Sequence, residues 1–495
     1  MHDIPAGQRT MERSIVRNIV INFAGAIAPT FISLVTVPAY IHLMGVERYG
    51  VINLVWTLIG YFSVLDLGTS LATENQISRA RAADDDSLER IFWSAWFMNL
   101  GTGIVGGLII YAGTIVYITH GVKIEPEFQR EVMASLPWIA VAVPIANVSW
   151  VFAGAINGVE RFASFNINQT LGTALFQLLP LAAIFCFSPS LAVVIPAAVL
   201  ARLLAGLMLG AAAFRAIGIR RVRMPQWRVM VELFRYGRWL LLFSGAGMIA
   251  STLDRVLVGA LLGARFVTYY ATPQNLITRL NLLPVAMVRT LFPRLSAVSR
   301  ADADAIARSA LAFLNGAFTP CLIVAMFALK PFLLLWLGPT VAAAAPVACV
   351  LILAVWLGGQ AGILGILIQA QASPASIAVV SWVQLPVFAG ALWCGIHWFG
   401  IMGAAVVVVL KALFDYGMLL YFARLHVGSI VRNMLVHLGF LLVALALAES
   451  VNELTSQIAA ALVLTCTNLG LSLHGSSELR GFVYRLWARV TLSTG

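Results

Sequence analysis

Charged residues are scarce in this sequence. Only 11% of its 495 residues are Asp, Glu, Lys or Arg, whereas 60% are hydrophobic, and the mean hydropathy is +0.91. Because soluble proteins have roughly a quarter charged residues, the composition excludes a soluble globular domain. Apolar runs long enough to cross a bilayer recur along the chain, and the alternating pattern of a membrane β-barrel is absent. The sequence therefore predicts an all-α polytopic membrane protein.

The residue spacings that enzymes and metal sites need are also missing. The five cysteines lie singly in apolar segments without a CxxC pair, which argues against a disulfide framework and a thiolate metal site. The seven histidines are scattered, and no GxSxG, HExxH or P-loop motif is present. The loops are short, whereas a membrane glycosyltransferase or polymerase needs large external loops to hold its chemistry. We therefore expect no enzyme, no metal and no cofactor.

The apolar runs form about fourteen predicted spans, joined by short loops. The fifth and sixth are separated only by the polar break FSPSL. The expected spans are 18–43, 49–77, 91–118, 132–156, 163–187, 190–214, 232–262, 266–293, 306–329, 342–370, 376–398, 400–423, 430–448 and 456–474.

Positive charge is distributed unequally between the two predicted sides of the membrane. With the N-terminus in the cytoplasm, most arginines fall on that side, and the densest cluster lies at 215–238. The opposite side receives only Arg48, Lys123, Arg130, Arg265 and Lys330. This asymmetry predicts both termini in the cytoplasm. It also accounts for the formal net charge of +11 without a nucleic-acid partner.

Two stretches of the sequence indicate an internal repeat. YIHLMGVERYGVINL follows the first span and LVGALLGARFVTYYA follows the seventh, and Gly45 and Gly263 occupy equivalent places in them. Arg202 and Lys411 fall at nearly the same depth in the sixth and twelfth spans. The pattern predicts two six-helix lobes related by a parallel repeat. The expected organisation is a cytoplasmic lead at 1–17, an N-lobe at 18–214, a basic cytoplasmic linker at 215–231, a C-lobe at 232–423, two extra helices at 424–474 and a cytoplasmic tail at 475–495.

Several ionisable residues fall inside the predicted spans, where they are costly and usually face a protein-lined interior. Helical projection places polar side chains on the same face as these charges in spans 2, 7 and 8, and we expect the faces to converge on one cavity. These side chains include Ser251 in span 7 and Thr272 and Asn275 in span 8. Lys411 and Asp415 are spaced i,i+4, so an ion pair that locks helices together is the alternative for those two. The candidates are Asp66, Arg202, Asp254, Arg255, Arg279, Lys411 and Asp415.

The order and spacing of several motifs resemble those of the Wzx-type polysaccharide flippases, members of the multidrug/oligosaccharidyl-lipid/polysaccharide (MOP) exporter superfamily. The opening stretch contains GVERYG at 45–50 and DLG at 66–68, and the later stretches are DRVLVGALLG, TYYATPQNL and LFPRLSAVS. The resemblance implies two six-helix, MATE-like lobes around a central cavity. It also implies a lipid-linked oligosaccharide, usually linked to undecaprenyl pyrophosphate, that alternating access flips from the cytoplasmic to the external leaflet of a bacterial plasma (inner) membrane. Asp66, Asp254 and Arg255 match the family's charged lumen.

These observations together predict a flippase for surface polysaccharide export. The cations Arg202, Arg255, Arg279 and Lys411 are expected to contact phosphate or acidic sugar, since guanidinium groups bind phosphate oxygens bidentately. The carboxylates Asp66, Asp254 and Asp415 are expected to balance them, and one is a candidate site for a coupling H⁺ or Na⁺. Expected partners are the lipid bilayer, the lipid-linked oligosaccharide and other polysaccharide-assembly membrane proteins.

Three alternatives stay open from the sequence. A cation-coupled multidrug or metabolite antiporter of the same superfamily predicts a cavity dominated by carboxylates, and the surplus of cations argues against it. A lipid II flippase of the superfamily shares all the features above. A membrane glycan polymerase predicts catalytic residues on large external loops.

Overall fold

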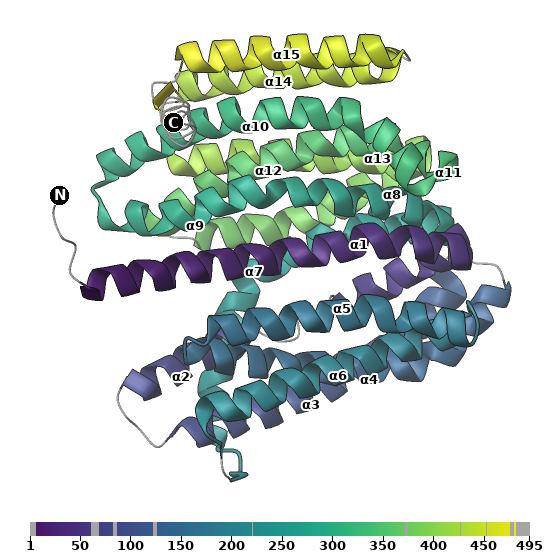
Figure 1. Ribbon diagram of the computed structural model, residues 1–495, viewed down its shortest axis with the longest axis vertical. Coiled ribbons are helices and arrows are strands. Elements are labelled where there is room, and N and C mark those ends of the chain that lie inside the picture. The colour runs from purple at the N-terminus through teal and green to yellow at the C-terminus, as the bar shows by residue number, and fades with distance from the viewer. Residues whose placement is uncertain are drawn as a thin grey trace. The chain divides into compact units, whose positions relative to one another are not determined.

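The computed structural model describes residues 6–60, 69–82, 87–121, 126–219, 221–371, 375–425, 427–451, 453–475 and 480–481. These residues are helical apart from short turns, as the ribbons of Figure 1 show. The first helices are α1 (Ala6–Gly60), α2 (Thr69–Ala82), α3 (Leu88–Val116), the π-helical turn η2 (Tyr117–Gly121), α4 (Pro126–Gly158), α5 (Phe162–Cys186), α6 (Leu191–Ile217) and α7 (Trp227–Leu262). The later ones are α8 (Ala264–Ile277), the 3-10 turn η3 (Thr278–Asn281), α9 (Leu282–Ala297), α10 (Arg300–Leu337), α11 (Pro339–Ala342), α12 (Ala345–Gln371), α13 (Ala375–Ala423), α14 (Val427–Ser450) and α15 (Leu454–Gly475).

Two of these helices each contain a sharp turn at a single glycine. Gly45 divides α1 with φ 84° and ψ 164°, and Gly400 divides α13 with φ 59° and ψ −142°. Positive φ is strained for residues with a Cβ atom, so glycine is the residue that allows the chain to reverse there without a loop. Each of the two helices therefore supplies parts of two predicted spans, 18–43 with 49–77 and 376–398 with 400–423.

The described helices agree with the predicted spans. Eleven of them are long and apolar enough to cross a membrane, counting α13 once. Predicted span 8 is divided among α8, η3 and α9, and predicted span 2 includes residues 61–68, which lie outside the described part. The all-α, multi-pass architecture with about fourteen spans is confirmed.

The predicted repeat is visible in the backbone. Gly263, which ends α7, has φ 101° and ψ 169°, close to the angles of Gly45. The helices that follow the two glycines cross in direct contact, because the Thr268 hydroxyl donates a 2.7 Å hydrogen bond to the Val46 carbonyl. At the same crossing, a Cβ atom added to Gly50 would lie 1.8 Å from the Ala264 carbonyl oxygen. The helices that follow the two equivalent turns thus approach so closely that Gly50 leaves no space for a side chain of its own.

The chain divides into two compact units, Met1–Thr268 and Tyr269–Gly495. The sequence placed the division at the linker 215–231, whereas α7 packs with α1, α2 and α3 of the first unit. Leu233, near the start of α7, is fully buried in the hydrophobic cluster of that unit. The lobe boundaries themselves stay a prediction.

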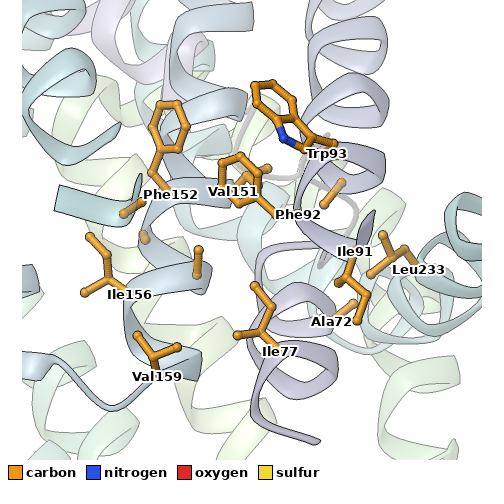
Figure 2. Packing of buried hydrophobic residues seen from close by; sticks show 14 of the residues in the cluster. Ala72, Ile77, Ile91, Phe92, Trp93, Val151, Phe152, Ile156, Val159 and Leu233 are labelled. Atoms are coloured by element: carbon orange, nitrogen blue, oxygen red, sulfur yellow. The ribbon is translucent and has the colours of Figure 1, made fainter. Parts of the chain in front are cut away.

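The hydrophobic cluster of the first unit joins α2, α3, α4 and the start of α7 (Figure 2). Phe92 of α3 is fully buried, and its ring centroid lies 6.1 Å from that of Phe152 on α4 and 5.4 Å from that of Trp93. Aromatic rings at these distances pack in offset or edge-to-face arrangements that add to the burial of their apolar area. The cluster fixes α4, which packs in turn against α6.

The basic connection between α6 and α7 is exposed but anchored to α3. Gly218 ends α6 in the left-handed conformation, and the Trp93 indole then donates a 3.0 Å hydrogen bond to the Arg221 carbonyl. Arg223 pairs with Glu89 at 3.3 Å, and the Gln226 N–H donates to the Ser94 hydroxyl at 3.0 Å. The sequence predicts a basic linker here, and these contacts bind it along the start of α3.

The second unit is built around α10 and α12. The Trp356 indole of α12 donates a 3.1 Å hydrogen bond to the Thr319 hydroxyl of α10, and both side chains are buried. The two C-terminal helices, α14 and α15, run side by side and pack on α10 (Figure 1). A hydrogen bond between two side-chain amides joins α10 to α14, since Asn315 donates to Asn433 at 2.7 Å. The extra helices are therefore packed parts of the unit.

Candidate functional site

Arg202 lies on α6 and faces α5. Its Cζ atom is 5.3 Å from the ring centroid of Phe176, which places the guanidinium over the aromatic face. Such a cation–π contact stabilises the charge more strongly where water is excluded. The Arg202 side chain is half-buried and lies in the middle of a helix that is apolar enough to cross the membrane.

A polar pocket of about 200 Å³ surrounds Arg202 in the first unit. It lies among α4, α5 and α6, and its polar side chains include Ser149, Asn168, Gln169 and Thr173. Its lining contains no carboxylate, and no ion pair joins Arg202 to any residue in the described part of the chain. The pocket thus combines an uncompensated cation with hydroxyl and amide groups, which suits an anionic, hydrogen-bonding ligand.

Lys411 occupies the corresponding position in the second unit. Its Nζ atom is 5.5 Å from the ring centroid of Phe388, across the hairpin formed by the two parts of α13. Unlike Arg202, it pairs with a carboxylate, because its Nζ lies 2.6 Å from Asp415 Oδ2. Gln384 donates a hydrogen bond to the other oxygen of Asp415. The i,i+4 ion pair that the spacing allowed is therefore formed.

The two cations form a repeated feature with one difference. Arg202 of α6 lies over a phenylalanine of α5, the preceding helix. Lys411, in the second part of α13, lies over a phenylalanine of the first part. The residue four positions after Lys411 is Asp415, whereas the residue four positions after Arg202 is Gly206. A Cβ atom on Gly206 would lie 2.8 Å from the Ser149 hydroxyl, so glycine keeps the pocket beside Arg202 open. The N-terminal cation is left available, and the C-terminal one is neutralised.

Asp254 and Arg255 lie in α7 in different surroundings. Asp254 is only 2% exposed, and its Oδ1 accepts a 2.8 Å hydrogen bond from the backbone N–H of Arg255. The Arg255 side chain is half-buried, while Ser251, on the same predicted face, is exposed. The face therefore passes from an exposed to a buried environment within one turn of helix.

Arg279 lies in the 3-10 turn η3 and is exposed. The sequence aligned it with Thr272 and Asn275 on one helical face, but Thr272 is buried and Asn275 is exposed. Thr272 and Asn275 lie in α8, before the turn, whereas Arg279 lies within it. A 3-10 turn advances about 120° per residue instead of 100°, so a projection that assumes a continuous α-helix does not hold at Arg279.

The predicted convergence of the charged faces on one cavity stays a prediction. Asp66 lies outside the described residues. The structure brings Lys411 and Asp415 together in the second unit and places Arg202 in a pocket of the first. Sequence reasoning missed Phe176, Phe388 and Gln384, because a partner on a neighbouring helix leaves no regular spacing in the chain.

An ion-pair cluster fixes the N-terminus of the helix that contains Arg202. Arg48 Nη2 lies 2.9 Å from Glu131 Oε1, and the other oxygen of Glu131 accepts a 2.9 Å hydrogen bond from the Leu191 N–H. A carboxylate at a helix N-terminus satisfies free N–H groups and interacts favourably with the helix dipole. Glu131 thus joins the turn after Gly45, α4 and the start of α6.

Replacing Glu131 with alanine is expected to lower the midpoint of thermal unfolding by several degrees, because charge-assisted hydrogen bonds are lost and Arg48 is left without its close partner. Glu127→Ala is the matched control, since Glu127 is exposed and 3.5 Å from the same arginine. Thermal unfolding of the purified protein in detergent checks the prediction. Equal midpoints for the two variants would contradict the assigned role of Glu131.

Comparisons with known proteins agree with this architecture. The family described as polysaccharide biosynthesis protein matches residues 15–299, which is more than half of the chain. A Shigella flexneri protein whose name describes an O-antigen transporter is 24% identical over 427 residues, covering 85% of this chain and 100% of that protein.

Solved structures show the same fold. The lipid II flippase MurJ in an inward closed conformation superposes with a TM-score of 0.69 at 11% identity, covering 93% of this chain and 99% of that one. An inward-facing multidrug resistance MATE transporter of the MOP superfamily has a TM-score of 0.67 at 13% identity, covering 84% of this chain and 99% of that one. The Shigella relative is named as a transporter, and the two solved structures are named as a flippase and a transporter. The chain therefore belongs to the polysaccharide biosynthesis protein family and has the MOP-superfamily fold that its resemblance to the Wzx-type flippases implied.

Proposed function

We propose that this protein flips a lipid-linked oligosaccharide, carried on undecaprenyl pyrophosphate, from the cytoplasmic to the external leaflet of a bacterial inner membrane by alternating access. Membership of the polysaccharide biosynthesis family and the similarity to a protein named for O-antigen transport support this substrate class. Both termini lie in the cytoplasm under this proposal, as the distribution of arginines predicts.

The uncompensated cation in the polar pocket of the first unit carries the proposal. Arg202 has no carboxylate partner among the described residues, and the hydroxyl and amide groups around it are those that bind sugars. A pyrophosphate or an acidic sugar supplies the negative charge that the pocket lacks. The polyprenyl chain stays in the lipid, where it loses no hydrophobic stabilisation.

The other predicted charges have secondary roles in this proposal. Arg255 and Arg279 contact the head group during its passage, and Lys411 does so only when its bond to Asp415 opens. Asp66, Asp254 and Asp415 balance the cations, and the buried Asp254 is the best placed of the described carboxylates to bind a coupling H⁺ or Na⁺. Other polysaccharide-assembly proteins of the membrane supply the substrate and remove the product.

A reconstituted flipping assay tests the proposal. The full chain is placed in liposomes with a fluorescent lipid-linked oligosaccharide in both leaflets, and a membrane-impermeant reductant then bleaches the outer leaflet. Flipping exposes the inner-leaflet probe, so the bleached share is expected to rise toward the whole signal. Phosphatidylcholine with the same label is the control and is expected to bleach only in the outer leaflet.

Two further substrates separate the proposal from its alternatives. Labelled lipid II is expected to flip more slowly than the oligosaccharide lipid, and ethidium is expected not to move with a proton or Na⁺ gradient. Gradient-driven ethidium transport without flipping would identify a multidrug antiporter. Flipping of lipid II alone would assign the protein to peptidoglycan precursors.

A further inference from the structure

A second polar pocket lies in the second unit, and none of the candidate site residues lines it. It has a volume of about 570 Å³ and is lined by α10, α14 and α15. The lining residues of α14 lie in its first three turns, and those of α15 lie near its end. The pocket therefore opens at one end of the three-helix group, on the side where the charge distribution predicts the cytoplasm.

Two arginines lie at this pocket without an ion-pair partner in the described part of the chain. Arg308 of α10 and Arg432 of α14 are both exposed lining residues. The carboxylate nearest to Arg308 in sequence, Asp304, lies 3.0 Å from Arg300 instead. Arg300 also donates to the Ala423 carbonyl, which fixes this pair at the edge of the helix group. The positive charge of the pocket is thus uncompensated.

Buried amides form the polar wall of the pocket. Asn315 is 2% exposed and donates a 2.7 Å hydrogen bond to Asn433, while its own carbonyl oxygen accepts no hydrogen bond. Two amides joined by one hydrogen bond leave one carbonyl and one N–H₂ unused, whichever way the pair is oriented. An unsatisfied buried polar atom is costly unless a ligand or water completes it. The pair therefore presents unused donor and acceptor groups to the cavity.

His437 adds a further polar group to the same wall. It is 3% exposed, and its Nδ1 lies 3.0 Å from the Asn468 side-chain nitrogen. This hydrogen bond uses Nδ1 and leaves Nε2 of the imidazole for a further polar partner. Apolar side chains complete the lining, and Val436 and Leu471 are 45% and 51% exposed in helices suited to lipid.

We propose that this pocket binds the phosphate head group of a membrane lipid in the cytoplasmic leaflet. The two guanidinium groups hold the phosphate oxygens, and the amide pair and His437 bind the remaining oxygens and hydroxyls of the head group. The exposed apolar residues pack along the lipid chain. The site shares no residue with the Arg202 pocket, and its occupancy does not depend on the proposed transport activity.

Lipid binding by the full chain tests the site. The purified protein in neutral detergent is titrated with phosphatidylglycerol or phosphatidylcholine, and bound lipid is counted by native mass spectrometry. The wild type is expected to bind phosphatidylglycerol about tenfold more tightly than phosphatidylcholine, because charge-assisted hydrogen bonds from the two arginines favour the anionic head group. The R308Q/R432Q variant is expected to lose this preference and to keep the wild-type unfolding midpoint, because both side chains are exposed.

A matched control and two competitors complete the test. Arg294→Gln removes an exposed arginine of the same unit that does not line the pocket, and it is expected to keep the preference. A polyprenyl phosphate is expected to displace phosphatidylglycerol, whereas inorganic phosphate at millimolar concentration is not. Equal binding of the two phospholipids by the wild type, an unchanged preference in R308Q/R432Q, or displacement by inorganic phosphate alone would overturn the proposal.

Discussion

Alanine in place of Gly50 is expected to prevent stable folding of the first unit. The added Cβ would lie 1.8 Å from the Ala264 carbonyl oxygen and 2.6 Å from its carbon, and both are backbone atoms. Ala264 cannot move aside easily, because Gly263 fixes the preceding turn and Thr268 is bonded to Val46. Separating the two helices would lose packing along their whole crossing, at a cost that approaches the few kcal/mol by which proteins are stable.

The yield of monodisperse protein after detergent extraction measures this effect. Gly50→Ala is expected to reduce it at least severalfold. Gly101→Ala is the matched control, since Gly101 is exposed on α3 and a Cβ there meets nothing within 4 Å. A Gly50→Ala protein with the yield and unfolding midpoint of the wild type would contradict the backbone contact.

Replacing Arg202 is expected to slow transport strongly. Arg202→Ala removes the uncompensated cation of the pocket, and the flipping rate is expected to fall by roughly tenfold to a hundredfold, as for the loss of one charge-assisted contact with a buried ligand. Arg202→Lys keeps the charge but loses the bidentate geometry, so an intermediate rate is expected. Arg130→Gln removes an exposed arginine outside the pocket and controls for net charge.

The repeat offers a sharper version of this test. Gly206→Asp places a carboxylate four residues after Arg202, as Asp415 follows Lys411, and is expected to abolish flipping although Arg202 remains. Gly206→Ala controls for the steric effect, because the added Cβ meets mainly the Ser149 hydroxyl, which can rotate. If Gly206→Asp transports as well as Gly206→Ala does, the free charge of Arg202 is not what the substrate requires.

Much of the fold follows from the sequence. Span positions depend on long apolar runs, which a bilayer requires regardless of how the helices pack. The equivalence of Gly45 and Gly263 was predictable because a turn with positive φ favours glycine, and glycine can be recognised in the sequence. The cations Arg202 and Lys411 stood out for the same reason, since charge is rare in apolar helices.

The remaining features depend on packing that no local pattern records. The sequence could suggest the bond between Lys411 and Asp415, because both residues lie on one helix. It could not suggest Gln384 or Phe176, which approach from neighbouring helices. Helical projection did not include the 3-10 turn at Thr278–Asn281, which contains Arg279. The anchoring of the basic linker depends on Trp93, an aromatic residue of a distant segment.

The turns at Gly45 and Gly263 also limit how the joined helices can move. With a flexible loop between them, one helix could shift without displacing the next. Here one residue separates each pair, so only one set of φ and ψ angles is available to accommodate a displacement. A displacement of either helix is therefore transmitted directly to the helix that follows or precedes it. The helices that follow the two turns are also in close contact at Gly50 and Ala264, and Thr268 is hydrogen-bonded to Val46. The two turns are therefore coupled, and a displacement at one is expected to move the other.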